Sequence, residues 1–298
     1  MPETPISERT AELERPLDTL SVRAMVGVMN RADASVAEHV AEHLDELGGA
    51  IEAIAGRLRD GGRLIYVGAG TSGRLAQVDA IECVPTFNLP EGMVLAIVAG
   101  GRESLERSTE EAEDDGSAGQ QAVAAHDVNE TDAVVGISAS GQTPFVVGGL
   151  DAARERGALT VAVTCNRGTT LARGAHHAVE VEVGPEVVAG STRLKAGTAQ
   201  KMVLNMISTA TMVTLGKTYG GLMVDVQPRN QKLRARALRV VIQATGAMQE
   251  EAVAALVGAD DDAKVAIVSL SARCAPAHAR EVLARAGGSV RRAIELSK

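Results

Sequence analysis

Aromatic residues are nearly absent from this chain of 298 residues, which contains two tyrosines, two phenylalanines and no tryptophan. Proteins that bind single-stranded nucleic acid stack the bases on aromatic side chains, so this class is disfavoured. An excess of positive charge is missing too, because 30 basic and 38 acidic side chains give a net charge of −8. That balance disfavours both nucleic acid and anionic membranes as partners.

Cysteine is also scarce. Its three positions lie far apart and form no C-x-x-C pair, which favours free thiols in a reducing cytoplasm. The N-terminus does not resemble a signal peptide, and no apolar run approaches the ~20 residues of a membrane-spanning helix. His39 and His43 lie four apart on a predicted helix, but Glu42 does not complete H-E-x-x-H and no third ligand is near. We expect a cytoplasmic protein without a metal ion.

What the sequence does have is a regular alternation of apolar runs and helical stretches. Five runs have the pattern of strands, at 63–67, 94–98, 133–137, 160–164 and 178–182. The first four are mostly apolar and show no alternation, as in a parallel sheet that is covered on both faces. The sequence therefore predicts a three-layer, doubly wound α/β fold with ligands at the carboxyl ends of the strands.

Helical periodicity dominates both flanks of the alternating region. Residues 21–30 and 33–59 are predicted helices, the second with Asp33 as N-cap, and residues 1–18 are predicted as a loosely packed arm. Residues 192–215 form a further long helical pattern. The expected domains are an N-terminal arm with helices over 1–55, a ligand-binding domain over 56–225 and a helical bundle over 226–298.

Two loops of small residues follow the first and third predicted strands, GAGTSGR at 68–74 and SASGQTP at 138–144. Such loops at helix starts present backbone N–H groups to a phosphate. Two of them in one domain, both with hydroxyls, indicate one ligand held from two sides. The candidate ligand-binding residues are Gly70, Thr71, Ser72, Ser138, Ser140, Gly141, Gln142 and Thr143.

The first loop also spells G-x-G-x-x-G, the dinucleotide fingerprint. That motif needs an acidic residue at the end of the next strand, where Gly100, Gly101 and Arg102 stand. Arg74 and Leu75 occupy the places where an ATP-binding loop needs Lys and Ser or Thr. Glycines that merely form tight strand-to-helix turns remain an alternative.

A basic stretch opens the long helical pattern. No acidic residue lies between Glu186 and Asp225, while four lysines and arginines do. Ser191 and Lys195 at its beginning are candidates for a third part of an anion site. A solvated basic face is the alternative, although cations at a helix start oppose the helix dipole unless an anion is bound there.

Two carboxylates could carry acid–base chemistry. Glu82 shares a helical face with Leu75 and Val78 and precedes Pro85, so we expect it half-buried near a helix C-terminus. Both conditions would raise its pKa and suit a general acid or base, whereas an exposed Glu at a frayed end is the alternative. Within the acidic run 110–115, nothing in the spacing separates Glu113 from its neighbours.

Longer motifs add what spacing alone does not give. The loop at 138–143 resembles the phosphosugar-binding loop of sugar isomerase domains. Four longer segments are GAGTSGRLAQVDAIECVPT (68–86), AED (112–114), GSTRLKAGTAQKMVLNMIST (190–209) and LMVDV (222–226). With these segments the chain resembles the N-acetylmuramic acid 6-phosphate etherase family from about residue 16 to the C-terminus. This resemblance implies a proton donor at Glu82, a second catalytic residue at Glu113, a phosphosugar-binding domain and a homodimer.

The resemblance also implies a lyase of cell-wall sugar recycling that releases D-lactate from its substrate by elimination and water addition, without a cofactor. Val84 replaces a second proline that is common in the family. Gln142 stands where arginine is frequent, and the loss of this positive charge bears on substrate affinity. An aldose–ketose sugar-phosphate isomerase would use the same loops but release no lactate. A non-catalytic sugar-phosphate sensor would not need the two carboxylates.

Overall fold

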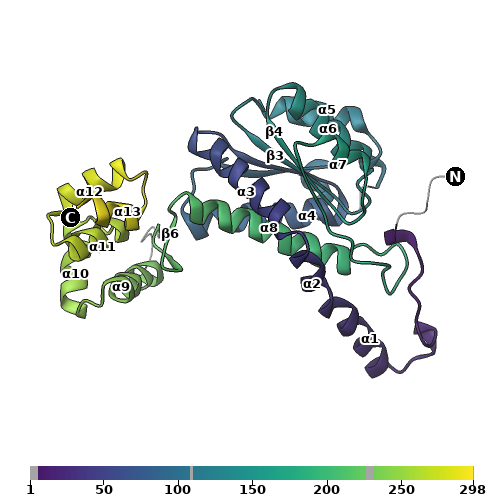
Figure 1. Ribbon diagram of the computed structural model, residues 1–298, viewed down its shortest axis with the longest axis horizontal. Coiled ribbons are helices and arrows are strands. Elements are labelled where there is room, and N and C mark those ends of the chain that lie inside the picture. The colour runs from purple at the N-terminus through teal and green to yellow at the C-terminus, as the bar shows by residue number, and fades with distance from the viewer. Residues whose placement is uncertain (1–5, 108–109, 226–230, 298) are drawn as a thin grey trace. The chain divides into compact units, whose positions relative to one another are not determined.

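The computed structural model describes residues 6–107, 110–225 and 231–297, which form two compact units (Figure 1). The first comprises the chain up to Ile81 together with Gly92–Ser208, and the second comprises Glu82–Glu91 and Thr209–Lys298. The start of the predicted arm and Val226 of the LMVDV motif lie outside the described residues.

The first unit contains a parallel five-stranded sheet with strand order β2-β1-β3-β4-β5. The strands are β1 (Leu64–Gly68), β2 (Val94–Val98), β3 (Ala133–Ser138), β4 (Leu159–Thr164) and β5 (His177–Glu180). Each of the five predicted strands is confirmed to within two residues at either end. All residues of β1, β3 and β4 are buried, as expected for strands that are covered on both faces.

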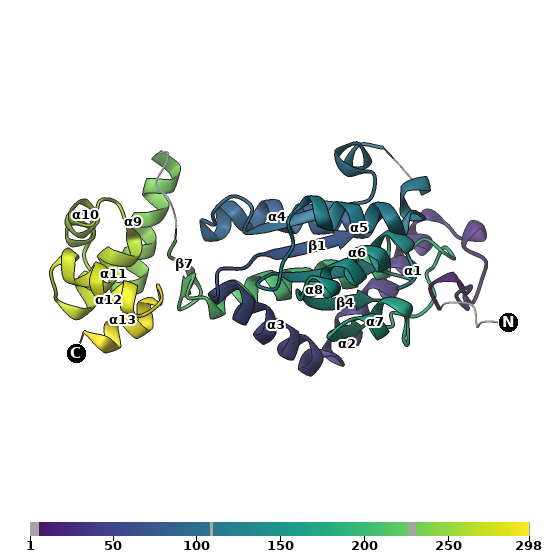
Figure 2. The ribbon, with the colours of Figure 1, turned by 90° about the horizontal axis from the view of Figure 1, so that it is seen from above.

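Helices cover both faces of this sheet. They are α3 (Leu44–Arg59), α4 (Gly70–Phe87), α5 (Gly116–Ala125), α6 (Pro144–Glu155), α7 (Thr170–Gly174) and α8 (Lys195–Thr214). One face is covered by α5, α6 and α7, and the other by α3, α4 and α8 (Figures 1 and 2). Ile65 and Val67 of β1 and Val134 of β3 share one core cluster with apolar residues of α5 and α6. The predicted three-layer α/β fold is confirmed.

The N-terminal segment differs from the prediction. It forms η1 (Ile6–Glu8), η2 (Leu17–Thr19), α1 (Val22–Ala34) and α2 (Val36–Ala41), so the helix predicted over 33–59 is wrong and Asp33 lies inside α1. The Ser35 hydroxyl donates to the Ala32 carbonyl, a local bond that competes with helix continuation. The His43 amide donates to the Val40 carbonyl and closes α2 with a tighter turn.

The second unit is mainly helical, as the sequence predicts. A short antiparallel hairpin of β6 (Thr218–Tyr219) and β7 (Leu222–Met223) precedes α9 (Gln231–Thr245), α10 (Gln249–Gly258), α11 (Ala263–Ala272), α12 (Pro276–Arg285) and α13 (Val290–Leu296). The first six residues of α11 are buried at the centre of this unit. Nowhere among the described residues is a helix both long and apolar enough to span a membrane.

Candidate active site

The two small-residue loops meet at the point where the strand order reverses. From β1 the chain continues to β2 at one edge of the sheet, whereas from β3 it continues to β4 and β5 toward the opposite edge. Doubly wound sheets bind ligands outside the carboxyl ends of the strands at such a reversal. Gly68 at the end of β1 pairs with Ile137 of β3. The sheet therefore brings both predicted loops together.

Ser138 organises the second loop. Its Oγ accepts a hydrogen bond from the Gly141 amide at 3.0 Å and is paired with Thr143 Oγ1 at 2.8 Å. Ser138 itself is buried, whereas Ser140 and Thr143 are half-buried and Gln142 is exposed. Gly141 has φ +67°, and any side chain there would clash with Thr169. Hydroxyls and the first turn of α6 thus converge in a form suited to a phosphate.

Gly70 places the first loop against a candidate catalytic carboxylate. It has φ +52°, and a methyl group added to it would lie 2.7 Å from Oε1 of Glu113. Glu113 ends η4 (Glu110–Glu113) and is half-buried. This contact distinguishes Glu113 from its acidic neighbours, which the sequence did not. The tight-turn interpretation holds for Gly68 and Gly73, because a methyl group on Gly68 would lie 2.8 Å from the Gly73 Cα.

Glu82 does not have the environment predicted for it. It lies on α4 but is exposed, and Val78, predicted on the same inward face, is 59% exposed. The expected half-buried position is therefore wrong, because this face of α4 is not the one that packs on the sheet. Pro85 does not stop the helix either. It lies in the last turn, and α4 ends only before Asn88, which has φ +50°.

At the start of α8, the position predicted for a bound anion is occupied by a carboxylate of the chain itself. The buried Glu186 carboxylate accepts hydrogen bonds from the amides of Lys195 and Ala196 at 3.1 and 2.9 Å. Lys195 Nζ donates to the Val183 carbonyl and is buried, not solvated. Burial lowers the pKa of Lys195, and the charge of Glu186 opposes this shift. Ser191 lies half-buried in the preceding loop.

Other residues that shape the site had weaker signals in the sequence. Arg74 on α4 donates to the carbonyls of Ser104 and Arg107 and fixes the segment that precedes the acidic run. Gln200 on α8 accepts a hydrogen bond from Ser72 in the first loop. A glutamine among the buried residues of a long helix was the signal for this contact.

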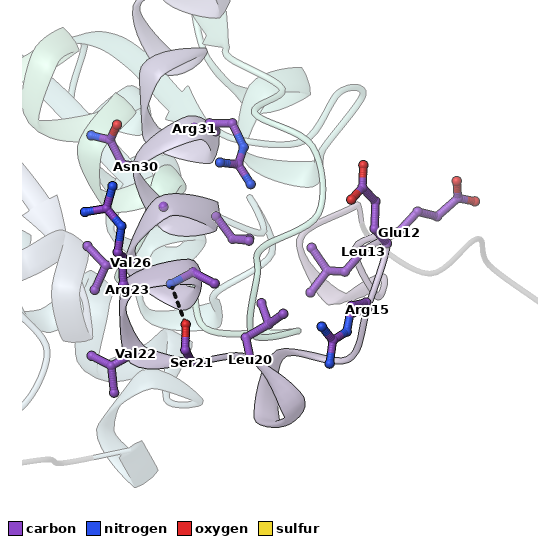
Figure 3. Close-up of a pocket in the computed structure, with 14 residues that line it drawn as sticks. Glu12, Leu13, Arg15, Leu20, Ser21, Val22, Arg23, Val26, Asn30 and Arg31 are labelled. Carbon is purple, nitrogen blue, oxygen red and sulfur yellow. Dashed lines mark hydrogen bonds between the residues drawn. The ribbon is translucent and has the colours of Figure 1, made fainter.

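One hollow of the first unit lies away from both loops (Figure 3). It has a volume of about 1140 Å³ and is lined by the N-terminal arm and α1, with side chains that include Leu13, Leu20, Val26 and Arg31. None of the predicted site residues lines it, so we place the candidate site at the loops. Within the described ranges, no group of three histidine, cysteine or acidic side chains could hold a metal.

Comparison with known proteins gives the family. Residues 46–154 match the glucokinase regulatory protein N-terminal SIS domain, and residues 105–210 match the SIS domain. An N-acetylmuramic acid 6-phosphate etherase of Rubrobacter xylanophilus is 53% identical over 97% of this chain and 95% of its own length. One of Mycolicibacterium smegmatis is 50% identical over 96% of this chain and 95% of its own length. The chain belongs to the N-acetylmuramic acid 6-phosphate etherase family.

Solved structures agree with the etherase family at the level of the fold. The phosphoheptose isomerase of Neisseria gonorrhoeae covers 64% of this chain and 98% of its own, with a TM-score of 0.51 and 18% identity. The phosphoheptose isomerase of Francisella tularensis covers 65% of this chain and 100% of its own, with a TM-score of 0.50 and 17% identity. The matches to the etherases, by contrast, extend over nearly the whole chain, including the helical second unit.

Proposed function

We propose that this protein is a carbon–oxygen lyase that cleaves the D-lactyl ether of N-acetylmuramic acid 6-phosphate, giving N-acetylglucosamine 6-phosphate and D-lactate. The observation that carries this proposal is the near-full-length identity of about half of all residues to etherases. An isomerase or a non-catalytic sensor is not favoured, because the etherases match nearly the whole chain at about half of all residues, whereas the two phosphoheptose isomerases cover 64–65% of it at 17–18% identity.

The reaction needs proton transfers and good positioning. An ether has a poor leaving group, so direct hydrolysis is difficult. Opening the sugar ring gives an aldehyde at carbon 1, which acidifies the proton on carbon 2. A base removes that proton, lactate leaves carbon 3 as it gains a proton, and water then adds to the double bond.

Glu82 and Glu113 are the proposed acid–base residues, with Glu82 as proton donor. For Glu113, the proposal is supported by its close approach to Gly70. For Glu82, it rests on the position of this residue in the segment 68–86 that resembles the family. A carboxylate can cycle between base and acid when its proton transfers are in reach of the reacting atoms.

The proposed phosphate cradle is the loop 138–143 with the start of α6. Its support is the cluster of hydroxyls around Ser138 and the positive end of the helix. Gly70, Thr71 and Ser72 are proposed to hold the sugar. Ser191 and Lys195 stay predicted contacts, and Lys195 Nζ donates one of its three N–H groups to the Val183 carbonyl.

We further propose that the protein is a cytoplasmic homodimer. Large apolar side chains are exposed on two helices of the first unit, with Val22 and Val26 on α1 and Val78 and Ile81 on α4. No residue of α1 is buried. A second copy of the chain would remove such side chains from water.

The decisive assay is lactate release from N-acetylmuramic acid 6-phosphate by the purified protein. In water labelled with deuterium and ¹⁸O, elimination places deuterium at carbon 2 and solvent oxygen at carbon 3. Retention of the original oxygen on the sugar would rule out elimination even if lactate appears. Label at carbon 2 without lactate would instead indicate an isomerase or epimerase.

A further inference from the structure

Gln200 has an unusual environment for an amide side chain. It is 1% exposed on α8, and its Oε1 accepts a hydrogen bond from Ser72 Oγ at 2.9 Å. Its Nε2 is buried and has no hydrogen-bond partner in the part of the chain that the structure describes. Buried amide N–H groups are almost always paired, so an orphaned one calls for an explanation.

The partner of Gln200 belongs to the first of the two loops that we propose to bind the ligand. Ser72 is in the first turn of α4, two residues after Gly70, and is 8% exposed. A serine hydroxyl has one proton to donate. In this structure that proton is directed to Gln200, so the oxygen of Ser72 can only accept. An anionic phosphate oxygen or a sugar carbonyl oxygen needs a donor instead.

We propose that Gln200 is a positioning residue that sets the direction of the Ser72 hydroxyl by turning its amide when substrate binds. A half turn places Nε2 where Oε1 lies now. Nε2 then donates to Ser72 Oγ, and the Ser72 proton becomes free for an oxygen of the phosphosugar. The turn gives the orphaned N–H group its partner, and the substrate supplies the new acceptor. This inference rests on the proposed function, in which Ser72 binds substrate.

A purely structural role for Gln200 makes a different prediction, and the chain offers a matched control. Asp79 of α4 accepts hydrogen bonds from Asn205 and Ser208 of α8, at 2.6 and 3.1 Å. These bonds join the same two helices as the Ser72–Gln200 bond but lie farther along α4. Ser208 is buried like Gln200. Loss of its hydroxyl therefore reports on a lost helix contact alone.

The test is a double-mutant cycle in the full chain between Gln200→Met and Ser72→Ala. We expect Gln200→Met to raise KM for N-acetylmuramic acid 6-phosphate about tenfold, the size of one hydrogen bond, with kcat changed less than about threefold. In the Ser72→Ala background the same change should have no further effect on KM. Ser208→Ala should lower the melting temperature and leave KM unchanged.

A second variant keeps the test sharp if Gln200→Met folds poorly. Gln200→Glu preserves size and the acceptor but has no N–H, so when ionised it holds the Ser72 proton. Its affinity for N-acetylglucosamine 6-phosphate, measured by calorimetry, should fall as pH rises across the titration of the new carboxyl. Equal effects of Gln200→Met with and without Ser72, or a pH-independent affinity of Gln200→Glu, would overturn the inference. If the wild type neither releases lactate nor binds this product, the proposed function fails instead.

Discussion

At the scale of single residues, the hydroxyls of the loop 138–143 differ in what they do. Ser138 is buried and accepts from the Gly141 amide, so it shapes the loop, while Thr143 is half-buried at the start of α6. We expect Thr143→Ala to weaken phosphosugar binding by about 1 to 3 kcal/mol with little change in melting temperature. Ser138→Ala should weaken binding and also lower the melting temperature. Calorimetric titration and thermal unfolding of both variants check this, and equal melting temperatures for the two would contradict it.

The two candidate catalytic carboxylates can be tested against a neighbour. Glu82→Gln and Glu113→Gln should each lower turnover at least ~10²-fold, since a general acid or base contributes that much or more. Glu111 is exposed in the same acidic run, so Glu111→Gln should retain turnover. Glu82 is exposed, so its replacement should not lower the melting temperature. Lactate release is the measurement, and a Glu111→Gln loss equal to that of Glu113→Gln would refute the assignment.

The residues of the site were predictable to different degrees. Glycines and hydroxyls that follow apolar strands identify both loops, because their chemistry is local. The exposure of Glu82 was not predictable, since it depends on which face of α4 packs on the sheet. Likewise, the Gly70–Glu113 and Ser72–Gln200 contacts join segments far apart in sequence, and no local pattern encodes them.

At the scale of elements, a buried polar cluster joins β1, α4 and α8. Asp79 accepts hydrogen bonds from Tyr66 at 2.8 Å, and from Asn205 and Ser208. Burial raises the pKa of the Asp79 carboxyl, an effect that these hydrogen bonds and the charge of Lys201 oppose. The folded protein therefore binds this proton more tightly than the unfolded chain does.

This pKa shift fixes the sign of a pH effect on stability. The contribution of Asp79 is fully present below its ordinary pKa of about 4 and is lost as pH rises through the raised value. The free energy of unfolding of the wild type, relative to Asp79→Asn, should therefore fall as pH increases above about 4. Urea unfolding from pH 4 to 7 measures it. Glu52→Gln, at an exposed position of α3, should show the wild-type pH dependence. A constant difference between wild type and Asp79→Asn would contradict the prediction.

The strands were easier to predict than the N-terminal helices. Nearly continuous apolar runs bounded by turn residues mark β1 to β4, because burial on both faces leaves few polar positions. The breaks between α1, α2 and α3 carry no glycine or proline. They depend on local hydrogen bonds of the Ser35 hydroxyl and the His43 amide, which no sequence pattern indicates.

At the scale of the whole molecule, exposed apolar side chains bear on the proposed homodimer. Val26 on α1 is 58% exposed, and Val257 on α10 is 71% exposed. If α1 contributes to the dimer, Val26→Asp should shift the protein to monomers, whereas Val257→Asp should not, because a buried charge without a partner is costly. Size-exclusion chromatography with light scattering gives the answer. A monomeric wild type, or dissociation by both substitutions alike, would disprove this role of α1.

The Glu186 carboxylate at the beginning of α8 determines when the first turn of this helix becomes ordered. Amides in the first turn of a helix lack partners within the helix, and in many enzymes a bound ligand supplies them. Here the amides of Lys195 and Ala196 are paired within the chain. The conformational entropy of this turn is therefore lost during folding and not during substrate capture. Hydrogen exchange at these two amides should be slow in the free protein and unchanged by ligand, so that α8 presents Gln200 from a rigid, preorganised base.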